Sequence, residues 1–323
     1  MTQEHMPAPT INIHNIEIAP GQQEVVKISV GRLPSGNVIK IQAHVYRSSV
    51  AGPIVLILAG VHGDEVNGVE IVRRAISVGY FEHLLRGTVI AIPILNIYGF
   101  INFSREVPDG KDINRSFPGN MNGSLASRVA RVLTKKILPL ADMVVDFHTG
   151  GQSHYNYPQI RYTKGDLLSE KLARAFSPPY LVVKPTIPKS LRKVAHEQGK
   201  PVLVFEGGES LRYDAYSIEK GLAGIQRLLY TQEMSETLPA SEEQPLVFHK
   251  TTWVRAPRAG MFLWEKCSGH RTAKGEVIGV INDPYGDGVV KVIAPRDGYL
   301  IGHNNAPVVS QGDALFHLGY EWE

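Results

Sequence analysis

Residues 54–78 read IVLILAGVHGDEVNGVEIVRRAISV, and this stretch decides the fold class. Its first seven residues are apolar without interruption, which is typical of a strand buried on both faces of a sheet. From Glu65 onward, apolar side chains such as Val66, Val69 and Val72 recur at helical spacing. A buried strand that leads through a short polar turn into an amphipathic helix is the repeating unit of α/β folds. We therefore expect an α/β domain.

Strands and helices alternate along most of the remaining chain. Further strands are predicted at 39–47 (near a sheet edge), 88–95, 143–147 and 201–206, and further helices at 124–138 and 214–230. This order predicts a mixed, largely parallel sheet flanked by helices. In such sheets, functional residues gather at the carboxyl ends of the strands.

The C-terminal part has a different pattern. Residues 231–250 are polar and acidic and contain two prolines, which indicates a linker. Beyond them, Ala-Pro-Arg-Ala-Gly at 256–260 is echoed by Ala-Pro-Arg-Asp-Gly at 294–298, and each copy precedes an apolar stretch and a Gly-acidic turn. This repeat predicts a quasi-symmetric, all-β module. We therefore divide the chain into an α/β domain, 1–245, and a small β module, 246–323, that caps or flanks the active site.

Composition and charge argue against several classes of function. The 323 residues carry a net charge of +3 without a run of Lys or Arg, so we expect no nucleic-acid partner. The apolar runs are far shorter than the roughly 20 residues that a membrane span requires. No secretion signal precedes the first strand, and Cys267 is the single cysteine, so we expect a cytoplasmic protein whose metal sites use His and carboxylates.

Two predicted strand ends carry metal-ligand residue types. His62 and Glu65 lie on the turn after the first buried strand, and His148 follows the strand at 143–147. Taken singly, the first pair is explained by a surface turn with a capping acid, and His148 is explained as a buried histidine. Together, two imidazoles and a carboxylate form a three-ligand set that leaves the fourth zinc position open, as a catalytic site requires. Asp146 is placed to orient an imidazole, or it is an ordinary strand-end acid.

Further polar residues suit hydrolysis at such a centre. Glu206 ends a third buried strand, where a carboxylate suits a general base. Asn114 and Arg115 lie in a polar loop and suit a substrate carboxylate, which a guanidinium binds through two hydrogen bonds. Arg105, ten residues earlier, is a candidate for stabilising a developing oxyanion. For the bare loop, salt-bridged surface is the alternative.

In chain order, HGDE at 62–65, D-x-N-R-x-F-P-G at 112–119, D-F-H at 146–148 and the later strand-end Glu206 resemble the succinylglutamate desuccinylase/aspartoacylase family, a branch of the zinc-carboxypeptidase-like fold. The resemblance implies one zinc ion, a small N-acyl amino acid as substrate, and hydrolysis to a carboxylate and an amine. It also implies roles for the matching residues: His62, Glu65 and His148 as zinc ligands, Glu206 as the catalytic glutamate, Asn114 and Arg115 as the carboxylate-binding pair, and Arg105 beside the oxyanion.

Other hypotheses stay open from the sequence. The protein is alternatively a zinc carboxypeptidase acting on peptides, or a non-catalytic binding relative. The C-terminal module resembles a biotinyl/lipoyl-like barrel, but its turn at 281–286 lacks the lysine of carrier domains. It therefore fits a cap of the active site or a subunit contact, which leaves a homo-oligomer open. Tyr285, Tyr299 and Tyr320 are open candidates for reaching the site. The acyl group and the amino acid are not specified by any motif.

Overall fold

The stretch at 54–78 folds as strand β5 (Ile54–Ala59) followed by helix α1 (Val66–Ser77). The structure is a computed structural model that describes residues 8–32, 35–240 and 244–323. Within these residues, β5 lies in the interior of a twelve-stranded sheet, and all but its first residue are buried. The strand order is β13 (Arg271–Thr272), β16 (Gly298–Asn304), β18 (Ala314–Trp322), β11 (Leu246–Arg255), β9 (Tyr180–Lys184), β8 (His154–Thr163), β10 (Val202–Glu209), β7 (Met143–Gly150), β5, β6 (Thr88–Ile92), β4 (Val38–Arg47) and β3 (Gln23–Arg32).

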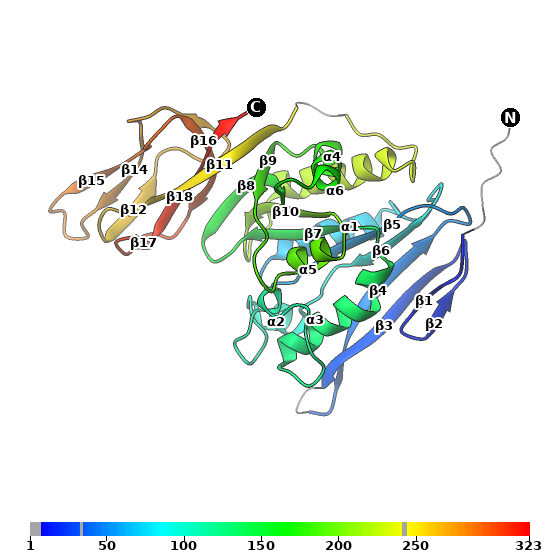
Figure 1. The fold of residues 1–323 in the computed structure, drawn as a ribbon. Coiled ribbons are helices and arrows are strands. Elements are labelled where there is room, and N and C mark those ends of the chain that lie inside the picture. The colour runs from blue at the N-terminus through cyan, green and yellow to red at the C-terminus, as the bar shows by residue number, and fades with distance from the viewer. Residues whose placement is uncertain (1–7, 33–34, 241–243) are drawn as a thin grey trace.

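Helices cover both faces of this sheet (Figure 1). One face packs against α1, α4 (Leu167–Phe176) and α6 (Ala215–Thr231). The opposite face packs against α3 (Leu125–Lys136), α5 (Leu191–Glu197) and the hairpin of β1 (Ile11–Ile13) and β2 (Ile16–Ile18). Short helices α2 (Ile97–Asn102), η1 (Ile113–Arg115) and η2 (Leu138–Leu140) lie in the connections. The result is the three-layer α/β architecture that the sequence predicts.

The prediction of a largely parallel sheet holds only for part of it. Strands β10, β7, β5 and β6 form a parallel block, and β8, β9 and β11 form a second one. The two blocks meet through the antiparallel pair of β8 and β10, and β3 and β4 add an antiparallel hairpin at the edge. The hairpin has the alternating burial of a sheet edge, whereas the parallel block is buried on both faces.

Several predicted boundaries differ from the structure. Strands β7 and β10 run to Gly150 and Glu209, beyond their predicted ends at 147 and 206, so that His148 and Glu206 lie inside strands. Strand β6 ends at Ile92 and not at residue 95, and the next residue is Pro93, which has no N–H for a ladder. The predicted linker ends earlier than residue 250, because Leu246 already begins β11 and pairs with Tyr180 of β9. Residues 241–243 of that linker lie outside the described residues.

The C-terminal region is all-β, as predicted, and its internal repeat is visible in the strand order. A four-stranded sheet runs β15 (Val289–Ile293), β14 (Val277–Asn282), β12 (Gly260–Trp264), β17 (Val308–Val309). It packs on β11, β18, β16 and β13, the end of the large sheet, around a shared apolar core. The two sheets have the same strand order when β11 is matched with β15, β12 with β16, β13 with β17 and β14 with β18. The barrel resemblance and the domain boundary stay predictions.

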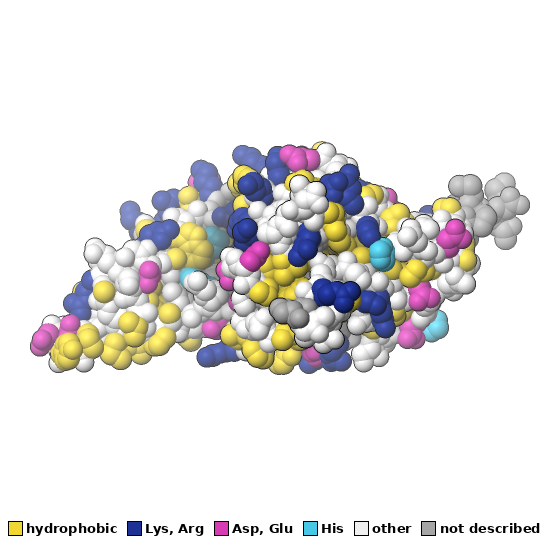
Figure 2. All heavy atoms as spheres, turned by 90° about the horizontal axis from the view of Figure 1, so that it is seen from below, with side chains coloured by type: hydrophobic (Ala, Val, Ile, Leu, Met, Phe, Trp, Pro, Cys, Tyr) yellow, Lys and Arg dark blue, Asp and Glu magenta, His cyan; other side chains and the backbone are white. Residues whose placement is uncertain are grey.

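The C-terminal strands and the β1–β2 hairpin lie at opposite ends of the molecule (Figure 1). On the C-terminal end, Figure 2 shows hydrophobic side chains gathered along the surface, and Met261, Leu263 and Val308 are among the exposed ones. Among the described residues, no helix is both long and apolar enough to cross a membrane.

Candidate metal centre and active site

The candidate site lies where the parallel strands β5, β7 and β10 end. His62 follows β5, His148 lies near the end of β7, and Glu206 lies in β10. The turn after β5 is tight because Gly63 packs on the backbone of α2. A Cβ at Gly63 would lie 1.9 Å from the carbonyl carbon of Gly99, so only glycine fits. The sequence rule that functional residues share the carboxyl edge therefore holds here.

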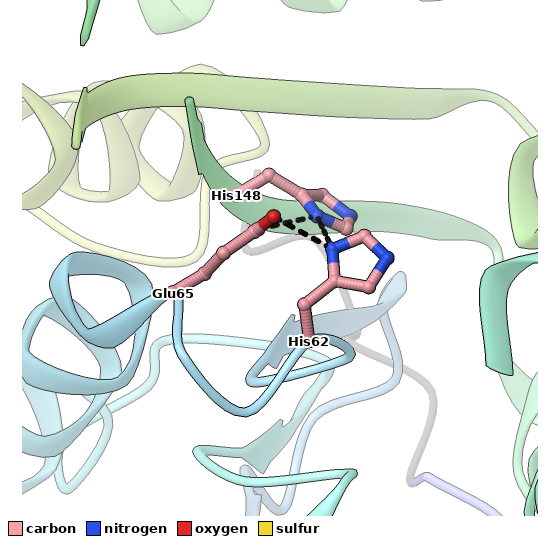
Figure 3. Close-up of side chains that lie close together, drawn as sticks. All are labelled: His62, Glu65 and His148. Carbon is pink, nitrogen blue, oxygen red and sulfur yellow. Dashed lines mark hydrogen bonds and ion pairs between the residues drawn. The ribbon is translucent and has the colours of Figure 1, made fainter. Parts of the chain in front are cut away.

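His62, Glu65 and His148 point their ligand atoms at one another (Figure 3). The Nδ1 atom of His62 lies 2.7 Å from one carboxylate oxygen of Glu65, and Nδ1 of His148 lies 2.8 Å from the other. The two Nδ1 atoms are 3.2 Å apart. All three side chains are buried. Two imidazole nitrogens and a carboxylate facing one point fit a divalent cation, because each has a lone pair to donate.

The outward nitrogens of both imidazoles face aspartates. Nε2 of His148 lies 2.9 Å from Oδ2 of Asp146, and Nε2 of His62 lies 3.3 Å from Oδ1 of Asp112. A carboxylate on the far nitrogen fixes the ring orientation and presents the other nitrogen as a ligand. Asp146 thus lies where the sequence analysis placed it, whereas Asp112 had no assigned role.

Arg105 lies beside the three ligand residues. Its guanidinium donates to Oδ2 of Asp112 at 2.8 Å, and Nη1 lies 3.3 Å from Glu65. Burial raises the pKa of Asp112, but its hydrogen bond with His62 and the charges of His62 and Arg105 outweigh burial and hold the pKa below its usual range. Asp112 is therefore ionised at neutral pH and keeps Arg105 next to the centre.

Glu206 is held by two donors from the neighbouring strand β8. Nδ2 of Asn156 donates to Oε2 at 2.9 Å, and Nη1 of Arg161 donates to Oε1 at 2.8 Å. The register between β10 and β8 shifts immediately after Glu206, across from the part of β8 that contains Pro158. Bulges of this kind redirect a side chain next to an active site. Glu206 is buried and faces the same cavity as the ligand residues.

These groups line one cavity of 360 Å³. The predicted site residues His62, Glu65, Arg105, Asn114, Arg115, His148 and Glu206 all line it, together with Asp146. Asn114 is fixed by accepting a hydrogen bond from the backbone N–H of Leu191 at 2.9 Å. Arg115 is exposed, and its guanidinium donates to the carbonyl of Asn114. The structure therefore brings together all seven residues for which the sequence predicts a catalytic, substrate-binding or metal-binding role.

Part of the cavity wall, including a group of basic side chains, is not predicted by the sequence. Arg161 and Arg192 line the cavity, and burial together with their charges lowers the pKa of nearby Lys184 to about 8. Burial and the charge of Arg161 lower the pKa of Arg192 to about 10. The Nη1 atom of Arg192 is buried and has no hydrogen-bond partner among the described residues. A cation held this way in a cavity wall favours an anionic ligand.

The C-terminal strands also contribute to the cavity. Trp253 of β11 and Ala314 of β18 line it, next to His154 of β8. Tyr285, Tyr299 and Tyr320, the candidates left open by the sequence, are not among its lining residues in the described part of the chain.

Comparison with known proteins agrees with the motif resemblance. The model of the succinylglutamate desuccinylase/aspartoacylase catalytic domain matches residues 51–231, more than half of the chain. The chain belongs to the succinylglutamate desuccinylase/aspartoacylase family. The matched residues contain all three candidate metal ligands, Glu206 and the Asn114–Arg115 pair. Members of this family are hydrolases that act on N-acyl amino acids.

Individual family relatives cover most of the chain. The N-alpha-acetyl-L-2,4-diaminobutyric acid deacetylase of Halomonas elongata is 28% identical over 82% of this chain and 81% of its own. A succinylglutamate desuccinylase/aspartoacylase structure from Rhodobacter sphaeroides is 26% identical, with a TM-score of 0.84 over 98% of this chain and 99% of that one. The product-bound ectoine utilization protein EutE (DoeB) of Ruegeria pomeroyi, 24% identical, has the same fold, with a TM-score of 0.84 over 98% of this chain and 99% of that one.

Proposed function

We propose that this protein is a zinc-dependent amidohydrolase that removes the acyl group from a small N-acyl amino acid. The observation that carries this proposal is the convergence of two imidazole nitrogens and the Glu65 carboxylate in the cavity that Glu206 also faces. Two His and one Glu are a ligand set of catalytic zinc sites that keeps a coordination position open. When bound, zinc supplies the Lewis acidity that activates water for attack near neutral pH.

The protein's own residues then divide the remaining work. Glu206 accepts a proton from the attacking water and delivers it to the departing amine nitrogen. The C–N bond breaks, the hydroxyl remains on the acyl carbon, and the products are a carboxylate and an amine. Arg105 donates hydrogen bonds to the oxyanion that develops on the carbonyl oxygen. Asn156 and Arg161 orient Glu206, because each of its carboxylate oxygens accepts one hydrogen bond from them.

The substrate's carboxylate binds Asn114 and Arg115 at the cavity wall. The positive charge of Arg192 in the cavity wall favours a further anionic group of the substrate on that side. The Halomonas relative is named as a deacetylase of an N-acetylated amino acid, which supports a small N-acyl substrate for this chain too. A cavity of 360 Å³ suits such a molecule better than an extended peptide.

Amine release across a panel of N-acyl amino acids and tripeptides tests this function. We expect the zinc-loaded protein to hydrolyse N-acyl amino acids and a chelator to abolish turnover. Cleavage of tripeptides alone would make the protein a carboxypeptidase instead. Stoichiometric zinc binding with no turnover of any panel member would support a non-catalytic role.

Substitution of the proposed general base is the sharpest single test. Glu206→Gln should keep zinc and lower kcat by about 100-fold to 10,000-fold, the usual contribution of a general base. Glu209→Gln is the matched control, because Glu209 lies three residues further along β10, where it accepts a hydrogen bond from Asn305. An unchanged kcat in Glu206→Gln would remove this residue from the reaction.

A further inference from the structure

Trp253 is a large side chain of the cavity wall that has no part in the function proposed so far. Trp253 comes from β11, in the all-β C-terminal region, and its indole lines the cavity. The residue is 38% exposed, although its neighbour Val254 is buried in the core of that region. A large aromatic surface left open inside a catalytic cavity is available to contact a ligand.

The indole is held in position from two sides. His317 is its direct partner across the β11–β18 pair, and the two rings stack with centroids 4.3 Å apart at 9°. The edge of His154 meets the indole at 5.7 Å and 80°. The His154 ring is itself anchored, since its two nitrogens each lie 3.3 Å from a carbonyl oxygen, of Gly151 and Ala314. Cross-strand pairs of this kind fix side-chain geometry.

The ring beneath the indole is uncharged. His317 is 3% exposed, and neither of its ring nitrogens has a hydrogen-bond partner among the described residues. Burial, with the charges of Arg161 and Lys184, keeps the pKa of His317 well below its ordinary value. Trp253 is therefore backed by a neutral, tightly packed ring and forms a firm wall.

The position of the wall indicates which part of the substrate it meets. In the proposed function, the substrate's carboxylate lies at Asn114, which is bonded to the start of α5, and its scissile carbonyl lies at the three ligand residues. Trp253 of β11 and Ala314 of β18 form another part of the lining together with residues of β8, and Trp253 is the largest side chain among them. The acyl chain leaves the scissile carbonyl on the side opposite the amine nitrogen, and we place it along this part of the lining.

We propose that Trp253, backed by His317, is a specificity-determining residue that limits the acyl group to short chains. This inference rests on the proposed function, because it assigns the acyl side of the same cavity. A firmly packed wall leaves no space for methylene groups added to the acyl chain. One extra methylene in a closed pocket changes kcat/KM by about tenfold or more. Removal of the indole opens the wall toward the C-terminal strands.

An acyl-length series tests the proposal. The wild type, Trp253→Ala and Trp264→Ala are compared on acetyl, propionyl, butyryl and hexanoyl derivatives of one amino acid. Trp264 is the matched control, since it is 42% exposed and lines a different cavity. We expect Trp253→Ala to raise the hexanoyl-to-acetyl ratio of kcat/KM by at least about tenfold, and Trp264→Ala to leave it unchanged. An unchanged ratio in Trp253→Ala, or an altered preference for the amino acid only, would overturn the proposal.

A binding measurement separates this inference from the proposed function. In a Glu206→Gln protein that also carries Trp264→Phe and Trp322→Phe, Trp253 is the sole tryptophan. Binding of an N-acetyl amino acid, followed by equilibrium dialysis, should change the emission of Trp253. Emission that stays constant at saturation would overturn the contact. An emission change in a protein whose parent hydrolyses no panel member would refute amide hydrolysis while the contact stands.

Discussion

The junction between β16 and β8 predicts a specific acid sensitivity. His303 of β16 lies opposite Tyr155 of β8, and their rings stack with centroids 5.1 Å apart. Nδ1 of His303 accepts hydrogen bonds from the hydroxyl of Ser268 at 2.7 Å and from its backbone N–H at 3.3 Å. Burial is the main reason that the pKa of His303 falls to about 4. The residue after Tyr155 is Asn156, which donates to Glu206.

The sign and size of the effect follow from this pKa. An unfolded histidine binds its proton near pH 6.5, so between about pH 6.5 and pH 4 the unfolded chain holds a proton that the folded chain lacks. Stability from His303 is thus fully present above about pH 6.5 and is lost as the pH falls. Between about pH 7.5 and pH 5, the linkage relation gives a loss of about 2 kcal/mol in the free energy of unfolding.

Urea unfolding of the wild type and His303→Asn at both pH values measures this loss. The asparagine side chain does not titrate, and its oxygen accepts a hydrogen bond where Nδ1 does. We expect the pH-dependent loss to be about 2 kcal/mol smaller in His303→Asn than in the wild type. His83→Asn replaces an exposed histidine and controls for removal of an imidazole in general. Equal pH dependence in the wild type and His303→Asn would refute the reasoning.

Two further predictions concern the metal centre and the turn that builds it. Asp146→Asn should weaken zinc binding by about 10-fold to 100-fold, because it removes the charge that orients an imidazole ligand. Asp142→Asn is the control and should leave zinc binding unchanged, because Asp142 is exposed and bonds the backbone of Ile54 instead. Competition with a chelator measures zinc binding in both variants. Gly63→Ala should destabilise the protein by about 3 kcal/mol in chemical unfolding, because its Cβ would overlap the backbone of Gly99. Gly151→Ala, whose Cβ would make only an ordinary contact, should cost far less, and equal losses would contradict the steric argument.

The sequence predicts the part of the site that lies on buried parallel strands. Strands β5, β7 and β10 contain near-continuous apolar runs, and His62, His148 and Glu206 follow directly after those runs, although β7 and β10 themselves continue to Gly150 and Glu209. Because parallel strands align their carboxyl ends, these residues converge without further information. The zinc, the roles of the site residues and the acyl group remain proposals.

The sequence does not predict the wall supplied by β8. Its residues 154–163 read HYNYPQIRYT, in which a proline and several polar side chains hide the pattern of a strand. Asn156 and Arg161 are polar because they face Glu206, so the functional contact itself removes the apolar signal. Trp253 is hidden for another reason, since only the pairing of β11 with β9 and β18 places it beside the cavity.

The continuity of the large sheet has a consequence for motion. Backbone ladders join β11 to β9 and β16 to β8, so the C-terminal strands share one hydrogen-bonded lattice with the strands that carry Glu206 and Arg161. A continuous β-sheet of this kind twists and bends as one unit. A hinge between its two ends would require the hydrogen bonds of both strand pairs, β11 with β9 and β16 with β8, to break. We therefore expect substrate entry and product exit to involve movements of side chains and connecting loops at the rim, which are faster than a swing of the whole C-terminal region.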